Sequence, residues 1–361
     1  MHVNKTATIF WAISSLGVSA ANADVNVVTS IKPVHSLVSS VMQGVGSPTV
    51  IIEGAGSPHT YSLKPSQAKQ LQDADLVFWM GDELETFLEG PIQNIAKNAK
   101  SIKLIDSHGL KKIKFREGGM FDEHDDHDDH DDHDKEEHAK DDHDDHGHDK
   151  HAKDDHDDHG HDKHAKDDHD DHGKEKHAKD DHDDHEHGEF DPHVWLDPIN
   201  AKAVVHEIEE ALVKADPKNA KKYEANAVRM AGNLDQLVTE LRVQLQPVQG
   251  KGFIVFHDAY QYFEQRFGVA AIGSITVSPE VMPGAERVKD LREKIRGLRA
   301  TCVFSEPQFE PKLVRTLVDG TGVQTGVLDP LGSSLTKGPD LYFELVREMA
   351  RSLKECLSAK S

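Results

Sequence analysis

The sequence of 361 residues predicts an α/β protein with two doubly wound parallel-sheet lobes bridged by one long helix. Apolar, β-branched runs alternate with helical patterns over residues 24–121 and again over 247–361, as they do in parallel sheets covered by helices. Residues 190–246 hold a re-entry segment and a helix-favouring run that is longer than an ordinary globular helix. A His/Asp-rich insert over 122–189 interrupts this pattern, and we expect it to be disordered.

In the first lobe, four apolar runs predict strands, and the segments between them have helical patterns. Pro33 and Pro65 open two of the helices, because proline is tolerated in the first helical turn. The predicted strands are residues 25–30, 49–53, 76–80 and 101–106, and the predicted helices are 33–43, a segment from 65, and 83–97.

The second half of the chain begins with helix signals. Asp197 is placed as an N-cap, and Pro198 as the first helical residue. Helix-favouring residues then continue to Gln246, with Asp216-Pro217 as the place where the run can break. The predicted strands that follow are 253–256, 271–277, 302–305 and 323–328, and the predicted helices are 260–267, 285–299, 311–319 and a terminal helix from 339.

Residues 1–23 have the pattern of a secretory signal peptide. Lys5 gives a short basic region, residues 7–20 are mostly apolar, and Ala21-Asn22-Ala23 is a small-x-small cleavage site. A membrane anchor is the alternative. Serines and a glycine interrupt its apolar stretch, however, and it falls short of the roughly 20 apolar residues that a span needs. We therefore expect an exported protein.

The net charge of the chain belongs to the insert. Residues 122–189 contain 32 acidic residues and nine lysines, which account for the whole formal net charge of -23. The rest of the chain is balanced, so it offers no basic surface for nucleic acid. The insert is a tandem repeat with almost no apolar side chains to bury, and burial therefore cannot offset the entropy of ordering its backbone.

The insert also holds 19 of the 26 histidines. Imidazole and carboxylate groups are ligands for borderline divalent metals, and His-x-x-His spacing recurs through the Asp-Asp-His units. We expect many weak, exchangeable metal sites in it; a solvated acidic linker is the alternative. The histidines assigned to this auxiliary metal loop are His124, His127, His130, His133, His143, His146, His148, His156, His159, His161, His169, His172, His182, His185 and His187.

The two cysteines fit an exported protein. Cys302 starts an apolar strand-like run, and Cys356 lies near the end of the last amphipathic helix. In an oxidising compartment the pair permits one disulfide, and two buried free thiols are the alternative. A zinc site made of cysteines is not expected, because the pair lacks the C-x-x-C spacing.

Three histidines outside the insert occupy positions suited to ligand binding. His59 and His257 each follow or end a predicted strand, and ligands of open α/β sheets bind outside the carboxyl ends of strands. His193 lies just before the bridging helix, so all three can face one cleft. The histidines interpreted as ordinary helix or loop residues are His35, His108 and His206.

Three neutral imidazoles favour Zn²⁺ over the harder Mn²⁺ and Mg²⁺. Tetrahedral zinc takes a fourth ligand. Asp329 directly follows the predicted strand 323–328, on the same sheet edge, and is the nearest carboxylate candidate. A turn role before Pro330 is the alternative for Asp329, and water can complete the site instead.

Four segments, in this order, resemble the motifs of the metal-receptor cluster of ABC-transporter solute-binding proteins. The segments are Gly56-Ser57-Pro58-His59-Thr60-Tyr61, Asp191-Pro192-His193-Val194-Trp195-Leu196-Asp197-Pro198, Phe256-His257-Asp258-Ala259-Tyr260 and Leu328-Asp329-Pro330-Leu331-Gly332. The insert and the cysteine pair resemble the zinc-uptake branch of that cluster, the ZnuA-like periplasmic receptors. The resemblance implies an interlobe zinc site made by His59, His193 and His257, and delivery of Zn²⁺ to an inner-membrane ABC permease.

The sequence departs from this family at one position. Some of its zinc receptors have a ligating glutamate directly before the first histidine, where this chain has Pro58. Manganese-type relatives put a carboxylate where His257 stands and use the aspartate matching Asp329, so the fourth ligand stays open. The predicted function is a monomeric, non-enzymatic zinc receptor of the periplasm; the alternatives are a receptor for another divalent metal such as Mn²⁺, a periplasmic zinc buffer and a zinc enzyme.

Overall fold

The computed structural model describes residues 25–116, 121, 189–276, 279, 283–297 and 300–359. The predicted signal peptide and all but the last residue of the predicted insert lie outside the described residues. Among the helices of the described ranges, none has the length and apolar character needed to cross a membrane.

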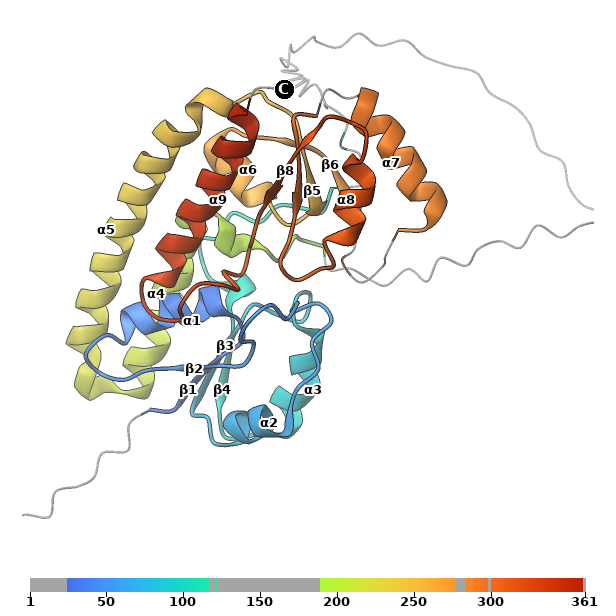
Figure 1. Ribbon diagram of the computed structural model, residues 1–361. Helices are drawn as coiled ribbons and strands as arrows, with labels where there is room; N and C mark the ends of the chain where they lie inside the picture. Colours follow the sequence, from blue (N-terminus) through green and yellow to red (C-terminus); the bar gives the residue numbers. More distant parts are fainter. Residues whose placement is uncertain are drawn as a thin grey trace, which may run out of the picture. The chain divides into compact units, whose positions relative to one another are not determined.

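The first sheet has four parallel strands in the order β2-β1-β3-β4, drawn in blue to cyan in Figure 1. The strands are β1 (Val27–Thr29), β2 (Thr49–Val50), β3 (Leu76–Trp79) and β4 (Lys100–Lys103). In the register of the sheet, Val28 pairs with Thr49 and Val77, and Val77 pairs with Ser101. The central strands β1 and β3 are buried along their whole length, which explains their continuous apolar sequence.

The first two helices of the first lobe begin at or next to the prolines that predicted them. The helices of this lobe are α1 (Lys32–Val41), α2 (Pro65–Gln72) and α3 (Thr86–Asn94). The predicted strand over 101–106 is shorter, because residues Leu104–Asp106 form a 3-10 helix after β4. The predicted helix over 83–97 is also shorter than expected, and it contains Pro91, which cannot donate a backbone hydrogen bond.

The helix-favouring run after the insert forms an antiparallel hairpin of α4 (Pro198–Ala215) and α5 (Ala220–Leu245). The break predicted at Asp216-Pro217 is confirmed, so the bridging helix starts at Ala220 and not at Pro198. The Asp216 carboxylate holds the corner by accepting a hydrogen bond of 2.9 Å from the Tyr223 hydroxyl. The predicted N-cap is also confirmed, because the Asp197 carboxylate accepts the Ile199 N–H at 2.8 Å.

Helix α5 connects the two lobes. It packs against α1 of the first lobe and against α9 (Leu341–Ser358) of the second. The face it buries carries Leu234, Leu237 and Leu241, which are fully buried. One continuous apolar core therefore includes residues of both sheets and of the helices between them.

The second sheet has four parallel strands in the order β6-β5-β7-β8 (Figure 1). The strands are β5 (Phe253–His257), β6 (Ala271–Thr276), β7 (Cys302–Ser305) and β8 (Gln324–Val327). The remaining helices are α6 (Gln261–Phe267), α7 (Ala285–Gly297) and α8 (Lys312–Val318). Each element agrees with its predicted segment to within a few residues.

The two cysteines form the predicted disulfide, which joins Cys302 in β7 to Cys356 in α9. The alternative of two free thiols is therefore wrong. The bond fixes the terminal helix to the second sheet.

The segment after β8 ties the second lobe to the first. Lys32, at the start of α1, donates to the carbonyl oxygens of Gly332, Ser333 and Leu335 at 2.7, 3.0 and 2.6 Å. The indole N–H of Trp195 donates to the Pro330 carbonyl oxygen at 2.9 Å. These bonds hold the segment in place beside the candidate site described below.

Candidate metal centre

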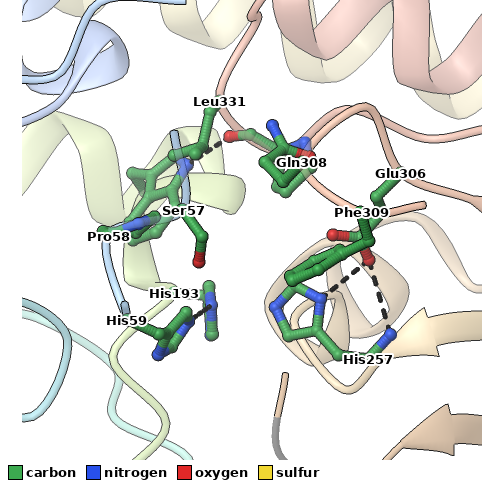
Figure 2. Close-up of a pocket in the computed structure, with 11 residues that line it drawn as sticks. Ser57, Pro58, His59, His193, His257, Glu306, Gln308, Phe309 and Leu331 are labelled. Atoms are coloured by element: carbon green, nitrogen blue, oxygen red, sulfur yellow. Dashed lines mark hydrogen bonds and ion pairs between the residues drawn. The ribbon is translucent and has the colours of Figure 1, made fainter. Parts of the chain in front are cut away.

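The three histidines singled out in the sequence come together in the structure. One ring nitrogen from each of His59, His193 and His257 lies within 4.8 Å of the others, and within the described part of the chain no other group of three potential metal ligands is as close. The ring centroids are 5.4 to 5.7 Å apart. Figure 2 shows the three rings around one small cavity.

Each histidine is positioned by a different part of the fold. His59 lies in the loop between β2 and α2, directly after Pro58. His193 precedes the 3-10 helix Val194–Leu196, which leads into α4. His257 is the last residue of β5, at the carboxyl end of a central strand, where ligands of parallel sheets bind.

His193 is held by a buried carboxylate. Its Nδ1 lies 2.7 Å from Asp191 Oδ1, and the same oxygen accepts the His193 backbone N–H at 2.9 Å. The other oxygen of Asp191 accepts from the Gln261 amide at 3.2 Å. Since the Asp191 carboxylate accepts a hydrogen bond from the Nδ1–H group, the Nε2 of His193 is the nitrogen left to bind a metal ion.

His257 has the same arrangement with a carboxylate from another strand. Its Nδ1 lies 2.8 Å from Glu306 Oε1, and Glu306 directly follows β7. The Nε2 of His257 is buried and has no hydrogen-bond partner among the described residues. A buried lone pair of this kind costs free energy unless a ligand takes it up.

The cavity beside the three rings is small. Its volume is about 10 Å³, close to the space that one water molecule needs. His59 Nε2 and His193 Nε2 are 3.3 Å apart across it. Ser57, Trp195 and Phe309 are among the other residues that line it. A space of this size suits a single ion.

Burial and neighbouring charges set the ionisation of the site. Burial lowers the pKa of the His193 imidazole well below its usual value, so this ring is neutral at neutral pH. Burial also opposes a charge on His257, but the carboxylates of Glu306, Asp258 and Asp191 together outweigh it and raise the pKa of that imidazole. Burial raises the pKa of the Asp191 carboxyl to about 7.

A second buried charge cluster lies beside His257. The Arg116 guanidinium forms ion pairs with Asp258, the residue after His257, and with Glu264 of α6. The guanidinium thereby compensates two carboxylates that are largely removed from solvent. These carboxylates are therefore already paired and are not free to act as metal ligands.

Asp329, the predicted fourth ligand, does not belong to the cluster of three. Its carboxylate accepts the backbone N–H groups of Leu331 and Ser333 at 3.1 and 2.5 Å, and the Gln308 amide at 2.9 Å. This is the turn role before Pro330 that the sequence left as the alternative. The histidines assigned to the auxiliary metal loop lie outside the described residues.

The sequence did not single out the two carboxylates that contact the clustered histidines. Asp191 belongs to the same motif as His193 and stands two positions before it. Glu306 follows the strand that ends at Ser305 and therefore occupies the same sheet edge as His257. The rule that sites lie at carboxyl ends of strands could have identified Glu306.

Known zinc-uptake proteins resemble this chain in sequence, and solved structures resemble it in fold. The family model "Zinc-uptake complex component A periplasmic" matches residues 27–356. The high-affinity zinc uptake system protein ZnuA of Brucella suis biovar 1 (strain 1330) is 54% identical over 342 residues, which cover 95% of this chain and 94% of that protein. A crystal structure of ZnuA has a TM-score of 0.67 at 23% identity, covering 93% of this chain and 100% of that one. A zinc-bound internal-deletion mutant of ZnuA has a TM-score of 0.66 at 22% identity, covering 94% and 100%.

Proposed function

This chain belongs to the family of periplasmic zinc-uptake components that includes ZnuA, and we propose that it is a periplasmic receptor that captures one Zn²⁺ with high affinity. We propose that it works as a monomer and delivers the ion to an inner-membrane ABC permease. Zn²⁺ is then a transported ligand and not the cofactor of a reaction.

The spacing of the three imidazole nitrogens carries this proposal. In a tetrahedral site with Zn–N bonds of about 2.0–2.1 Å, two ligand nitrogens lie about 3.4 Å apart. His59 Nε2 and His193 Nε2 are 3.3 Å apart, and a nitrogen of His257 lies within 4.8 Å of both others. Small movements of the rings suffice to bond all three to one zinc ion.

The chemistry of the donor set supports zinc over manganese. The cluster contains imidazole nitrogens and no carboxylate oxygen, within the residues that the structure describes. Zinc binds imidazole well, whereas Mn²⁺ prefers carboxylate and water oxygens. The two carboxylates nearest to the rings, Asp191 and Glu306, are already bonded to Nδ1 atoms.

We propose that water, and not Asp329, is the fourth ligand of the zinc ion. Ser57 Oγ and Glu306 Oε2 line the cavity and are buried, without a hydrogen-bond partner in the described ranges. Figure 2 shows the Ser57 hydroxyl directed toward His59 and His193. A zinc-bound water placed there can hydrogen-bond to these two oxygens.

We propose that the insert serves as an auxiliary zinc-collecting loop. Its 19 histidines among many carboxylates provide numerous weak ligands, and its sequence ends four positions before His193. Zinc bound by its histidines is tethered through the chain to His193, which raises the effective zinc concentration for that residue.

Zinc titration calorimetry with competing manganese tests the receptor function. The full chain should bind one zinc ion tightly and several weakly, and a variant lacking residues 122–188 should keep only the tight site. His59→Ala removes one proposed zinc ligand. It should raise the dissociation constant of the tight site by a factor of 100 or more, which corresponds to roughly 3 kcal/mol. His206→Ala, which removes an exposed helix histidine, is the control. Loss of the tight site on deletion, or its survival in His59→Ala, would contradict the proposal.

A further inference from the structure

Among the described residues, a buried carboxylate contacts His193 and another contacts His257. Asp191 contacts His193 and Glu306 contacts His257, at Nδ1 distances of 2.7 and 2.8 Å. Asp191 is 0% and Glu306 3% exposed. The two carboxylates come from different segments: Asp191 precedes α4, and Glu306 follows β7. The site therefore contains the same histidine–carboxylate pair twice.

Neither carboxylate is used elsewhere as the partner of a cationic side chain. Within the described ranges, Asp191 and Glu306 form no ion pair with lysine or arginine, whereas the neighbouring Asp258 and Glu264 both pair with Arg116. Burying a carboxylate without a cation is costly, and natural proteins retain such groups where another positive charge is bound. A cation in the cavity on the other side of each imidazole ring can supply that charge.

We propose that Asp191 and Glu306 are positioning residues for the transported ion, and that their two negative charges balance the two positive charges of Zn²⁺. This inference rests on the proposed function. Three neutral imidazoles bind zinc without neutralising it, and the two carboxylates behind the rings are placed to balance the charge. A carboxylate on Nδ1 also fixes the tautomer whose Nε2 faces the metal and makes that nitrogen a stronger donor.

Two conservative substitutions can distinguish a positioning role of these carboxylates from a purely structural one. Asp191 and Glu306 also accept backbone N–H groups, at 2.9 Å and 3.4 Å, and a structural role would depend on those bonds. Asn and Gln keep an oxygen that can accept the same N–H groups, but they remove the charge. Asp191→Asn and Glu306→Gln therefore test the charge and the hold on Nδ1 with little change in shape.

Zinc affinity is measured by competition with a chromogenic chelator in the full-length protein. We expect Asp191→Asn and Glu306→Gln each to raise the zinc dissociation constant about 10- to 100-fold, the range found for outer partners of metal-bound histidines. Glu85→Gln is the matched control, because Glu85 is a fully buried carboxyl of the first lobe that does not line the cavity. The zinc affinity of the Glu85→Gln variant should equal that of the parent protein.

A double-mutant cycle gives the sharper result. If Glu306 acts largely through His257, then Glu306→Gln should cause a much smaller loss of zinc affinity in a His257→Ala background than in the parent protein, whereas Asp191→Asn should still weaken binding there. Equal losses from Glu306→Gln in both backgrounds would indicate a general structural defect and overturn the proposal. Parent-like affinity of both charge-removing variants would also overturn it.

Failure of this inference is distinguishable from failure of the receptor function. If the parent protein and Glu85→Gln bind no zinc tightly, the receptor function itself is wrong, and the inference falls with it. If both bind zinc tightly and Asp191→Asn and Glu306→Gln do so equally well, the receptor function stands and only the positioning role is lost.

Discussion

Glu85 shows how one buried carboxyl makes stability depend on pH. It is 0% exposed, and its Oε2 accepts the backbone N–H groups of Met80 and Gly81 at 2.7 and 3.2 Å. Burial raises its pKa from 4.5 to about 7. The folded state therefore holds the proton more strongly than the unfolded state, so the stabilisation is fully present below about pH 4.5 and is lost as the pH rises through about 7.

We predict that Glu85→Gln removes this dependence. Between pH 4.5 and 8 the metal-free parent protein should lose about 3 kcal/mol of unfolding free energy through this group, and the variant should not. Urea unfolding of both proteins at pH 5 and pH 8 measures the difference. The same pH dependence in parent and variant would show that Glu85 ionises normally in the folded protein.

At the residue scale, the sequence could predict the three histidines that cluster but not the carboxylates that contact two of them. His59 and His257 follow or end strands, and this position is visible in the apolar pattern. The bond between His257 and Glu306 joins residues 49 positions apart, and only the pairing of β5 with β7 brings them together. For Asp329 the sequence left two roles open, because a carboxylate before proline suits both a turn and a metal.

At the scale of elements, Asp197 serves both as the N-cap of α4 and as an ion-pair partner. It accepts the Ile199 N–H, and it also pairs with Arg266 of α6 at 2.6 Å. We predict that Asp197→Ala lowers the unfolding free energy by about 2–4 kcal/mol, because cap and pair are lost together. Asp197→Asn should recover about 1 kcal/mol by restoring the cap.

Chemical denaturation of these variants measures both effects. Asp235→Ala is the control, because it removes an ion pair between Lys202 of α4 and α5 that is half exposed and should contribute about 0–1 kcal/mol. If Asp197→Ala were no more destabilising than Asp235→Ala, the cap and the pair with Arg266 would contribute nothing to α4.

The disulfide should contribute to stability without affecting zinc binding. Cys302 and Cys356 are separated by 54 positions, and closing a loop of that length stabilises by about 4 kcal/mol in the chain-entropy model. The double variant Cys302→Ser and Cys356→Ser should lose about that much unfolding free energy, yet keep its zinc affinity, because neither residue lines the cavity. A parallel loss of zinc affinity would show that the bond also shapes the site.

The limits of the sequence are clearest in the helix hairpin. Helix-favouring residues run almost without interruption from α4 into α5, so periodicity alone gives one long helix. The reversal depends on Asp216 and Pro217, and on a tertiary bond from Tyr223 that propensity does not contain. The sheets could be predicted almost strand by strand, because their central strands are buried on both faces and read as continuous apolar runs.

At the scale of the whole molecule, Lys32 joins the lobes through a single buried ammonium. It donates to three carbonyl oxygens of the segment after β8, and the same segment supplies Pro330 and Leu331 to the cavity wall. We predict that Lys32→Met lowers the unfolding free energy by about 2–4 kcal/mol, since three carbonyl oxygens lose their donor. Zinc should also dissociate faster, because the cavity wall is held less firmly.

Stopped-flow release of zinc to a chelator and denaturation measure these two effects. Lys337→Met is the control, because Lys337 forms an exposed ion pair with Glu53 and should contribute about 0–1 kcal/mol. If Lys32→Met behaved like Lys337→Met in both measurements, the coupling of the lobes through Lys32 would be refuted.

The most direct test of the zinc site is a crystal structure of the zinc-loaded protein with anomalous scattering recorded at the zinc edge. The account predicts one strong peak bonded to Nε2 of His59, His193 and His257 at about 2.0–2.1 Å, with water as the fourth ligand. A peak bonded to Asp329, or zinc bound away from these three rings, would contradict it.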